Sequence, residues 1–316
     1  MPRVVVTRGL PAGALAALRG SGADVWVSRE DRALGVEELH AVVAGADAVV
    51  TMLHDTVDEA FLAAAGDQLR IVANVAVGYD NVDLDAARRH GVIVSNTPGV
   101  LTDATADLAI ALLLAVTRRL GEGERRIRSG EPWTWSIDFM LGRGLRGKTL
   151  GVVGYGAIGR ATAARARAFG MEVVYTRRSR GDDPAQVELE ELLARAHAIS
   201  LHCPLTPETH HLIGAEALGR MRDDAYLVNT ARGAVVDEAA LADALRDGVI
   251  AGAGLDVFER EPSVHPGLVG LENVVLVPHL GSATVETRAA MAELAAANVI
   301  AVLGGDEPPT PVDVRR

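Results

Sequence analysis

Three polar residues follow short apolar runs that read as strands, and their types suit anion binding and proton transfer. They are Arg232 after residues 226–228, Glu261 after residues 253–256, and His279 after residues 274–277. The carboxyl ends of parallel strands meet at one edge of a sheet, so we expect these side chains to lie close together. An arginine can clamp a carboxylate, and a histidine can donate a proton near neutral pH.

A glycine-rich segment indicates what binds beside them. Residues 154–159 read Gly-Tyr-Gly-Ala-Ile-Gly and follow the apolar run 149–153, which is typical of a dinucleotide-binding turn between a strand and a helix. The first glycine permits the tight turn, the second lets the backbone approach a pyrophosphate, and the third allows close helix packing. We expect cofactor contacts at Gly154, Gly156, Ala157, Ile158 and Gly159. A plain tight turn is the alternative.

The segment after the next expected strand, residues 172–175, is basic. NAD-binding domains place an acidic residue about 20 residues after the glycines, where it binds the ribose hydroxyls. Here residues 177–180 read Arg-Arg-Ser-Arg. Guanidinium groups and a hydroxyl can bind a 2′-phosphate, which a carboxylate would repel. Arg177, Arg178 and Ser179 therefore predict NADP(H) as the preferred cofactor, with NAD(H) as the second candidate; a solvated basic turn is the alternative.

Together these features suit the reduction of a 2-oxo acid. A nicotinamide would supply the hydride, and Arg232 would hold the substrate carboxylate and polarise its carbonyl group. His279 would donate the proton, while Glu261 would orient its ring and favour the imidazolium form. Each residue also has a plain structural reading: Arg232 as a surface ion pair, His279 as a core histidine, Glu261 as an exposed acid.

The elements that must position these residues alternate between apolar runs and amphipathic segments, which indicates an α/β protein with parallel sheets. In the first part, strands are expected at residues 4–6, 25–27, 48–53, 71–75 and 92–95, and helices at 14–18, 37–43, 59–65 and 84–89. One long helix is expected over residues 104–120, followed by a polar stretch.

The strand rhythm then restarts. Six strands are expected at residues 149–153, 172–175, 198–201, 226–228, 253–256 and 274–277, and a final helix at 283–303. Six parallel strands in two halves describe a Rossmann domain. We expect two Rossmann-like domains with a cleft between them: a flavodoxin-like substrate domain of residues 1–98 and 287–316, and an NADP-binding domain of residues 99–286.

Two further segments complete a resemblance to a known family. Residues 74–83 read Asn-Val-Ala-Val-Gly-Tyr-Asp-Asn-Val-Asp, and residues 96–102 read Asn-Thr-Pro-Gly-Val-Leu-Thr. With the segments above, they resemble the D-isomer-specific 2-hydroxyacid dehydrogenases, and within that family most of all the glyoxylate/hydroxypyruvate reductases. The motifs occur in the family's order over nearly the whole chain.

The resemblance implies roles for individual residues. Arg232, Glu261 and His279 would form the catalytic set, the backbone N–H groups of Val77 and Gly78 would bind the substrate carboxylate, and Leu53 would lie near the substrate. The cofactor would be lined by Thr105, Cys203, Pro204, Thr230, Ala231, Asp256 and Gly281. The family's usual acid after the second strand corresponds to Arg177, which agrees with NADPH.

The resemblance also implies a homodimer. Trp133 and Trp135 lie in the segment that forms the dimer arm in related reductases, and the apolar helix over residues 104–116 would join the two domains and contribute to a two-fold interface. The plain reading of these tryptophans is interface core.

Composition limits the classes of binding partner and the location that we expect. The 316 residues contain 42 acidic and 31 basic side chains, for a net charge of −11, which argues against nucleic acid and anionic membranes. The longest apolar run, residues 108–116, is too short to span a bilayer. The single Cys203 cannot form an internal disulfide, so a cytoplasmic location is expected. The histidines near it lack metal-ligand spacing, and no metal is expected.

Two other functions are compatible with the same residues. A broader 2-oxo acid reductase would use the same residues on bulkier substrates. A non-catalytic, NAD(P)-sensing protein like the corepressors that share this fold would keep the nucleotide site without turnover.

Overall fold

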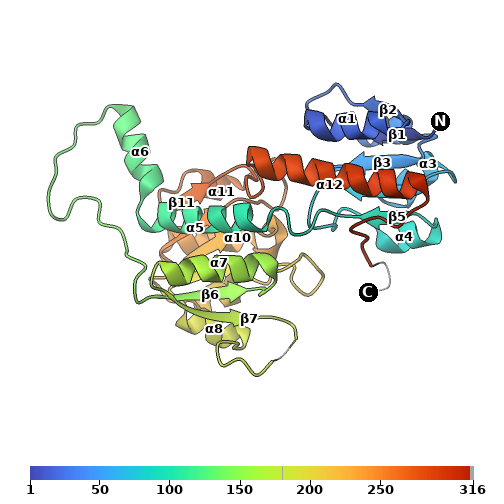
Figure 1. Ribbon diagram of the computed structural model, residues 1–316. Coiled ribbons are helices and arrows are strands. Elements are labelled where there is room, and N and C mark those ends of the chain that lie inside the picture. Colours follow the sequence, from blue (N-terminus) through green and yellow to red (C-terminus); the bar gives the residue numbers. More distant parts are fainter. Residues whose placement is uncertain (180, 314–316) are drawn as a thin grey trace. The chain divides into compact units, whose positions relative to one another are not determined.

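The computed structural model describes residues 1–179 and 181–313, and its contacts divide the chain into two compact units (Figure 1). Unit 1 comprises Met1–Leu101 and the chain from Ala283 onwards, and unit 2 comprises Thr102–Ser282. Domain boundaries were expected after residues 98 and 286, and the contacts place them after Leu101 and after Ser282. Each unit contains one parallel sheet with helices on both faces, so the expected α/β class with two parallel-sheet units is confirmed.

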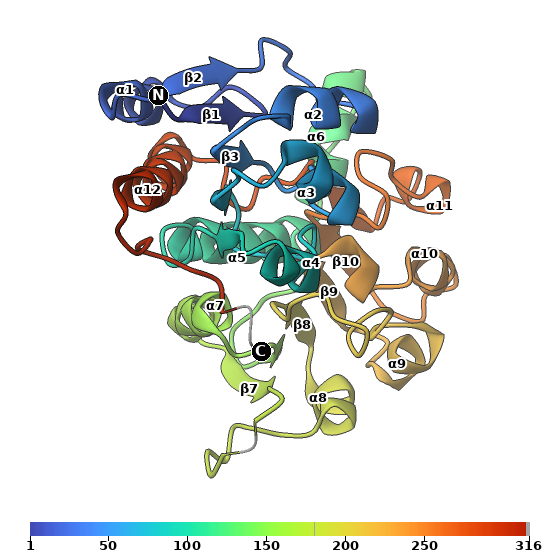
Figure 2. The same ribbon diagram turned by 90° about the vertical axis from the view of Figure 1, so that its right-hand side faces the viewer.

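Unit 1 is built on a five-stranded sheet. Its spatial order is β2 (Asp24–Val27), β1 (Arg3–Val6), β3 (Ala48–Thr51), β4 (Ile71–Asn74) and β5 (Ile93–Ser95), which is the flavodoxin-like order. Helices α1 (Ala12–Gly20) and α12 (Val285–Gly304) cover one face, and α2 (Val36–Val43), α3 (Glu59–Ala65) and α4 (Leu84–Arg89) cover the other (Figure 2).

Coverage of both faces explains why the inner strands of unit 1 are apolar throughout. In β1, Val4 and Val6 pack with α1 and α12, whereas Val5 packs with α2 and α3, and all three side chains are fully buried. Side chains of a strand point alternately to the two faces, so a sheet with two covered faces needs apolar residues at every position.

Helix α12 is long and apolar enough to cross a membrane by length and composition alone, as are many core helices of soluble proteins. Its small residues Ala292, Ala295 and Ala296 are buried in the core between α12 and the sheet of unit 1. We therefore assign α12 to the core of unit 1.

Unit 2 is built on a six-stranded sheet. Its spatial order is β11 (Val274–Leu276), β10 (Gly252–Leu255), β9 (Tyr226–Asn229), β8 (Ala198–Leu201), β6 (Thr149–Val153) and β7 (Glu172–Thr176). Helices α5 (Thr102–Thr117) and α7 (Ala157–Ala168) cover one face. The other face carries α8 (Leu189–Arg195), α9 (Ala215–Arg220), α10 (Glu238–Arg246) and the short α11 (Pro266–Val269).

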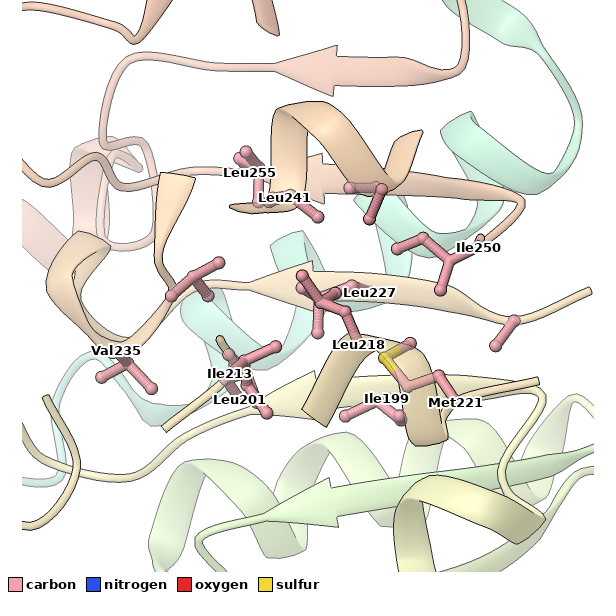
Figure 3. Close-up of a cluster of buried hydrophobic side chains, with 14 of the residues drawn as sticks. Ile199, Leu201, Ile213, Leu218, Met221, Leu227, Val235, Leu241, Ile250 and Leu255 are labelled. Carbon is pink, nitrogen blue, oxygen red and sulfur yellow. The ribbon is translucent and has the colours of Figure 1, made fainter. Parts of the chain in front are cut away.

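The second face of this sheet holds the larger core of unit 2. Figure 3 shows Leu227 and Leu255 from the strands meeting Leu241 of α10 and Leu218 and Met221 at α9. The order in which strands are added reverses at β6, since β7 lies on one side of it and the next strand in sequence, β8, lies on the other. Beyond β7, a single parallel bridge between Tyr175 and Gln186 takes the place of a further strand. The glycine-rich turn follows β6, so it lies at the switch point where such sheets bind ligands.

The long helix expected over residues 104–120 is present as α5 and differs only at its ends, but the polar stretch after it contains a further helix that was not expected. Helix α5 ends at Thr117, and α6 (Leu120–Ser129) follows a turn in which Arg119 adopts a φ of 54°. Helix α6 has no buried residue, so no apolar stripe marked it in the sequence. Together with the chain over residues 130–142, it extends away from the sheet of unit 2 (Figure 1).

Candidate active site

The three expected catalytic residues follow neighbouring strands of unit 2. Arg232 follows β9, Glu261 follows β10 and His279 follows β11, and these strands lie side by side in the sheet. The shared edge therefore brings residues that are distant in sequence to one end of the sheet.

His279 and Glu261 form a direct hydrogen bond. Nδ1 of His279 donates to Oε2 of Glu261 over 2.8 Å, and Oε1 of Glu261 accepts the backbone N–H of Phe258 over 3.0 Å. Burial would raise the pKa of the Glu261 carboxyl, but the hydrogen bond and charge of His279 hold it below its usual value. Glu261 is therefore ionised at neutral pH, as a carboxylate that orients a histidine must be.

The backbone of His279 is fixed by Asp256. His279 has a φ of 54° and donates its N–H to the carbonyl oxygen of Asp256 over 2.8 Å. The Asp256 carboxylate accepts the N–H groups of Leu280 and Gly281, and the hydroxyl of Thr105 donates to the carbonyl of Gly281 over 3.1 Å. Burial raises the pKa of Asp256 despite these hydrogen bonds. Asp256 thus holds the loop that presents the histidine ring.

The turn that carries Arg232 is fixed by Asn229 and packs tightly on the Glu261 loop. The Asn229 amide donates to the carbonyl of Arg232 over 2.8 Å, and its oxygen accepts the N–H of Ala231 over 3.0 Å. A Cβ atom on Gly233 would lie 1.8 Å from the carbonyl carbon of Phe258. The positive charge of Arg232 also contributes to lowering the pKa of Glu261.

The glycine-rich turn fits a dinucleotide. Gly154 has a φ of 91°, and a Cβ atom there would lie 2.5 Å from the backbone nitrogen of Cys203. A Cβ on Gly159 would lie 2.2 Å from the carbonyl oxygen of Gly154, whereas Gly156 has open space beside it. Among the described residues, no side chain caps the start of α7, so the first N–H groups of the helix, from Ala157 to Gly159, are available to an anion.

The basic segment after β7 is exposed and tethered at its base. Gln186 donates its side-chain amide to the carbonyl of Ser179 over 3.0 Å, and the hydroxyl of Tyr175 donates to Asp183 over 2.9 Å. The N–H of Ala185 and the Tyr175 hydroxyl lower the pKa of Asp183, so this acid is engaged within its own loop. Arg177 and Arg178 are exposed beside Ser179, and Arg180 lies outside the described residues.

The other expected cofactor residues lie at the ends of β8 and β9. Cys203 is buried, and burial raises the pKa of its thiol to about 11, so it is a neutral side chain packed beside the glycine turn. Pro204 follows it at the surface. Thr230 is buried with a hydroxyl that finds no hydrogen-bond partner in the described part of the chain, and Ala231 lies next to it, half-buried.

Sequence reasoning missed one cation at the glycine turn. Arg160 lies in the first turn of α7, and its Nη1 atom donates to the carbonyl of Tyr155 over 3.0 Å. The signal was its place directly after Gly159, where a side chain leaves the start of the helix.

In unit 1, the loop after β4 presents two backbone N–H groups. The amides of Asn96 and Asn74 donate to the carbonyl oxygens of Val77 and Gly78 over 2.8 and 3.0 Å. The N–H groups of Val77 and Gly78 donate to no acceptor within residues 1–179 and 181–313. Leu53, after β3, is 38% exposed. Sequence reasoning named this loop but missed the two asparagines that hold its carbonyl groups.

Over residues 1–179 and 181–313, no group of three or more His, Cys, Asp and Glu side chains is arranged to hold an ion. The expectation that the protein needs no metal stays a prediction.

Comparison with known proteins gives the family. Residues 110–281 match the D-isomer specific 2-hydroxyacid dehydrogenase, NAD binding domain. The glyoxylate reductase of Thermococcus litoralis is 48% identical over 99% of this chain and 97% of its own length, and that of Pyrococcus furiosus is 48% identical over 99% and 95%. The crystal structure of the TT0316 protein from Thermus thermophilus has a TM-score of 0.93 at 50% identity, covering 98% of this chain and 99% of its own. The chain belongs to the D-isomer-specific 2-hydroxyacid dehydrogenase family, whose members are oxidoreductases acting on small 2-hydroxy and 2-oxo acids.

Proposed function

We propose that this protein is an NADPH-dependent reductase of glyoxylate and hydroxypyruvate, with glycolate and D-glycerate as products. The observation that carries the proposal is the hydrogen-bonded pair His279–Glu261, whose residues follow β11 and β10, and β10 lies beside β9, which leads to Arg232. The curated relatives of 48% identity are named glyoxylate reductases, which supports glyoxylate as a substrate.

Each residue of this set has one task. With Nδ1 of His279 engaged by Glu261, Nε2 is the ring nitrogen that delivers a proton to the substrate oxygen. Glu261 fixes the ring and stabilises its protonated form, and Arg232 binds the carboxylate and polarises the carbonyl. A bound nicotinamide supplies the hydride.

Unit 1 is the proposed substrate-binding domain. The N–H groups of Val77 and Gly78 suit a carboxylate, because they have no acceptor among the described residues, while the carbonyl oxygens of the same two residues are bound by asparagine side chains. Leu53 is the proposed apolar contact for the remainder of a small substrate.

Unit 2 is the proposed NADP-binding domain. Arg177, Arg178 and Ser179 would bind the 2′-phosphate, and Arg160 with the turn at residues 154–159 would bind the pyrophosphate. The remaining contacts are proposed at Thr105, Cys203, Pro204, Thr230, Ala231, Asp256 and Gly281. A solved glyoxylate/hydroxypyruvate reductase from Sinorhizobium meliloti, 34% identical with a TM-score of 0.86, is described as NADPH-dependent and in complex with NADP and malonate.

A homodimer in the cytoplasm is the proposed working form. The segment formed by α6 and residues 130–142, called the arm below, exposes a concentration of large apolar side chains: Leu120, Ile127, Trp133, Trp135, Ile137 and Leu141. Large exposed apolar groups gathered on one segment indicate a protein interface. The single, buried Cys203 suits a reducing compartment.

Steady-state oxidation of NADPH and of NADH tests the proposal, with glyoxylate, hydroxypyruvate, pyruvate and a branched 2-oxo acid as substrates. We expect kcat/KM to be highest with NADPH and the two smaller substrates. Preference for the branched acid would replace the substrate with a broader 2-oxo acid class, and preference for NADH would refute the role of Arg177. Binding of NADPH without turnover would favour the cofactor-sensing function.

A further inference from the structure

One buried carboxylate contacts the Glu261 loop on both sides of Glu261. Glu238 is the first residue of α10 and is only 6% exposed. Its Oε1 atom accepts the backbone N–H of Glu259 over 2.7 Å, and its Oε2 atom accepts the backbone N–H of His265 over 3.3 Å. A carboxylate is costly to bury unless such donors satisfy its oxygens.

The contact is reciprocal at one end of the loop. Oε1 of Glu259 accepts the backbone N–H of Glu238 over 2.8 Å, so each of these two residues binds the main chain of the other. His211 lies nearby, with Nε2 at 3.4 Å from Oε1 of Glu259 but without the alignment of a hydrogen bond. The beginning of the loop is therefore fixed to the start of α10 by two hydrogen bonds that involve no catalytic side chain.

The position of Glu261 depends on where these two ends lie. Between them, Glu261 reaches back to the N–H of Phe258 and forward to His279 over 2.8 Å. Hydrogen bonds of this kind weaken outside about 2.7–3.2 Å, and a misplacement of about 1 Å at a reacting group can cost about 10²-fold in rate. A loop held only at one end would let Glu261 leave this range.

We propose that Glu238 is a positioning residue for proton transfer, which acts by clamping both ends of the loop that carries Glu261. The inference rests on the proposed roles of Glu261 and His279 and adds a residue that touches neither substrate nor cofactor. The clamp also explains why Glu238 is buried, although an acid at the start of a helix would cost less free energy if it faced solvent.

The variant Glu238→Gln tests the clamp with little change of shape. An amide offers one acceptor oxygen and one NH₂ donor, so one of the two loop N–H groups loses its acceptor. We expect kcat with glyoxylate to fall about 10- to 100-fold, within the range of a misplaced acid–base group. The Kd for NADPH, measured by fluorescence, should change less than about twofold. The matched control is Asp237→Ala, which removes the helix cap on Ala240 without touching the loop: its melting temperature should fall while kcat stays unchanged.

A double-mutant cycle separates positioning from general damage. If Glu238 acts through Glu261, then Glu238→Gln should change kcat less than about twofold in a Glu261→Gln background. An equal loss in both backgrounds, or a wild-type kcat for Glu238→Gln alone, would overturn the clamp while leaving the proposed reaction intact. A wild-type kcat for Glu261→Gln alone would overturn the proposed proton-donor pair and the clamp with it. If Glu238→Gln does not fold, Glu238→Asp keeps the charge with a shorter reach and is judged by the same criteria.

Discussion

His279 and Glu261 lie 18 residues apart in the chain, yet Nδ1 of the histidine is 2.8 Å from Oε2 of the glutamate. The approach depends on the pairing of β10 with β11 and on Asp256, which binds the loop after β11 through both carboxylate oxygens. The histidine is therefore held through its backbone by one acid and through its ring by another.

Loss of either member of this pair should slow reduction at unchanged cofactor affinity. We expect His279→Ala to lower kcat for glyoxylate by about 10²- to 10⁴-fold and Glu261→Gln by a smaller factor, because the ring remains but loses its ionised partner. His40→Ala, on α2 of unit 1, is the control and should keep the wild-type rate. Turnover by His279→Ala at the original rate across pH would show that another group donates the proton.

The basic segment after β7 should set cofactor choice. Arg177→Asp places a carboxylate where the expected 2′-phosphate binds, so we expect the Kd for NADPH to rise at least about tenfold while that for NADH stays the same or falls. Arg195→Asp, on α8, makes the same change of charge outside this segment and controls for the general field. Equal effects of Arg177→Asp on both cofactors, measured by fluorescence titration, would reject a contact with the phosphate.

Much of the fold could be predicted because strands buried on both faces are continuous apolar runs. Val4–Val6 form such a run. The expected strands differ from the observed ones only at their ends. Helix α6 could not be predicted in this way, since none of its residues is buried and its sequence is polar.

The residues of the candidate site also fall into a group that the sequence predicts and a group that it does not. Arg232, Glu261 and His279 could be predicted because each follows an apolar strand, and parallel strands share one edge. Glu238 could not, because its two acceptor contacts lie 21 and 27 residues further along the chain and go to backbone N–H groups, which every residue type except proline possesses. The same holds for Asn74 and Asn96, which also bind backbone atoms, the carbonyl oxygens of Gly78 and Val77.

The arm should hold two copies of the chain together. Ile127 and Ile137 are 60% and 82% exposed, and we expect the double variant Ile127→Asp/Ile137→Asp to shift the protein from dimer to monomer because it places charges in an apolar interface. Light scattering after gel filtration measures the mass directly. Val36→Asp, at an exposed position of α2 in unit 1, should leave the mass unchanged, and a wild-type mass that is already monomeric would refute the proposal.

His202 should make the protein less stable in acid. Burial lowers the pKa of its ring from 6.5 to about 4, with Nε2 bound to the Ser200 hydroxyl at 2.8 Å. Below pH 6.5 the unfolded chain takes up a proton that the folded protein refuses, so stability is complete above that pH and declines as the pH falls towards 4. The full loss is about 3 kcal/mol. Urea midpoints at pH 7.5 and 4.5 should therefore differ more in the wild type than in His202→Gln, and equal differences would contradict the buried neutral ring.

Gly233 should be the glycine of unit 2 that tolerates a methyl group least. A Cβ atom there would lie 1.8 Å from the carbonyl carbon of Phe258, and only a backbone shift could relieve it, because the contact is to main chain. We expect Gly233→Ala to lower the free energy of unfolding by about 3 kcal/mol or more, and to lower kcat as well, since the Arg232 turn and the Glu261 loop must move apart. Gly219 in α9 has open space beside it, so Gly219→Ala should instead raise stability by up to about 1 kcal/mol through its better helix propensity. Urea unfolding of both variants gives the comparison, and a Gly233→Ala protein with wild-type stability and rate would mean that the two loops do not need to touch for His279, Glu261 and Arg232 to work together.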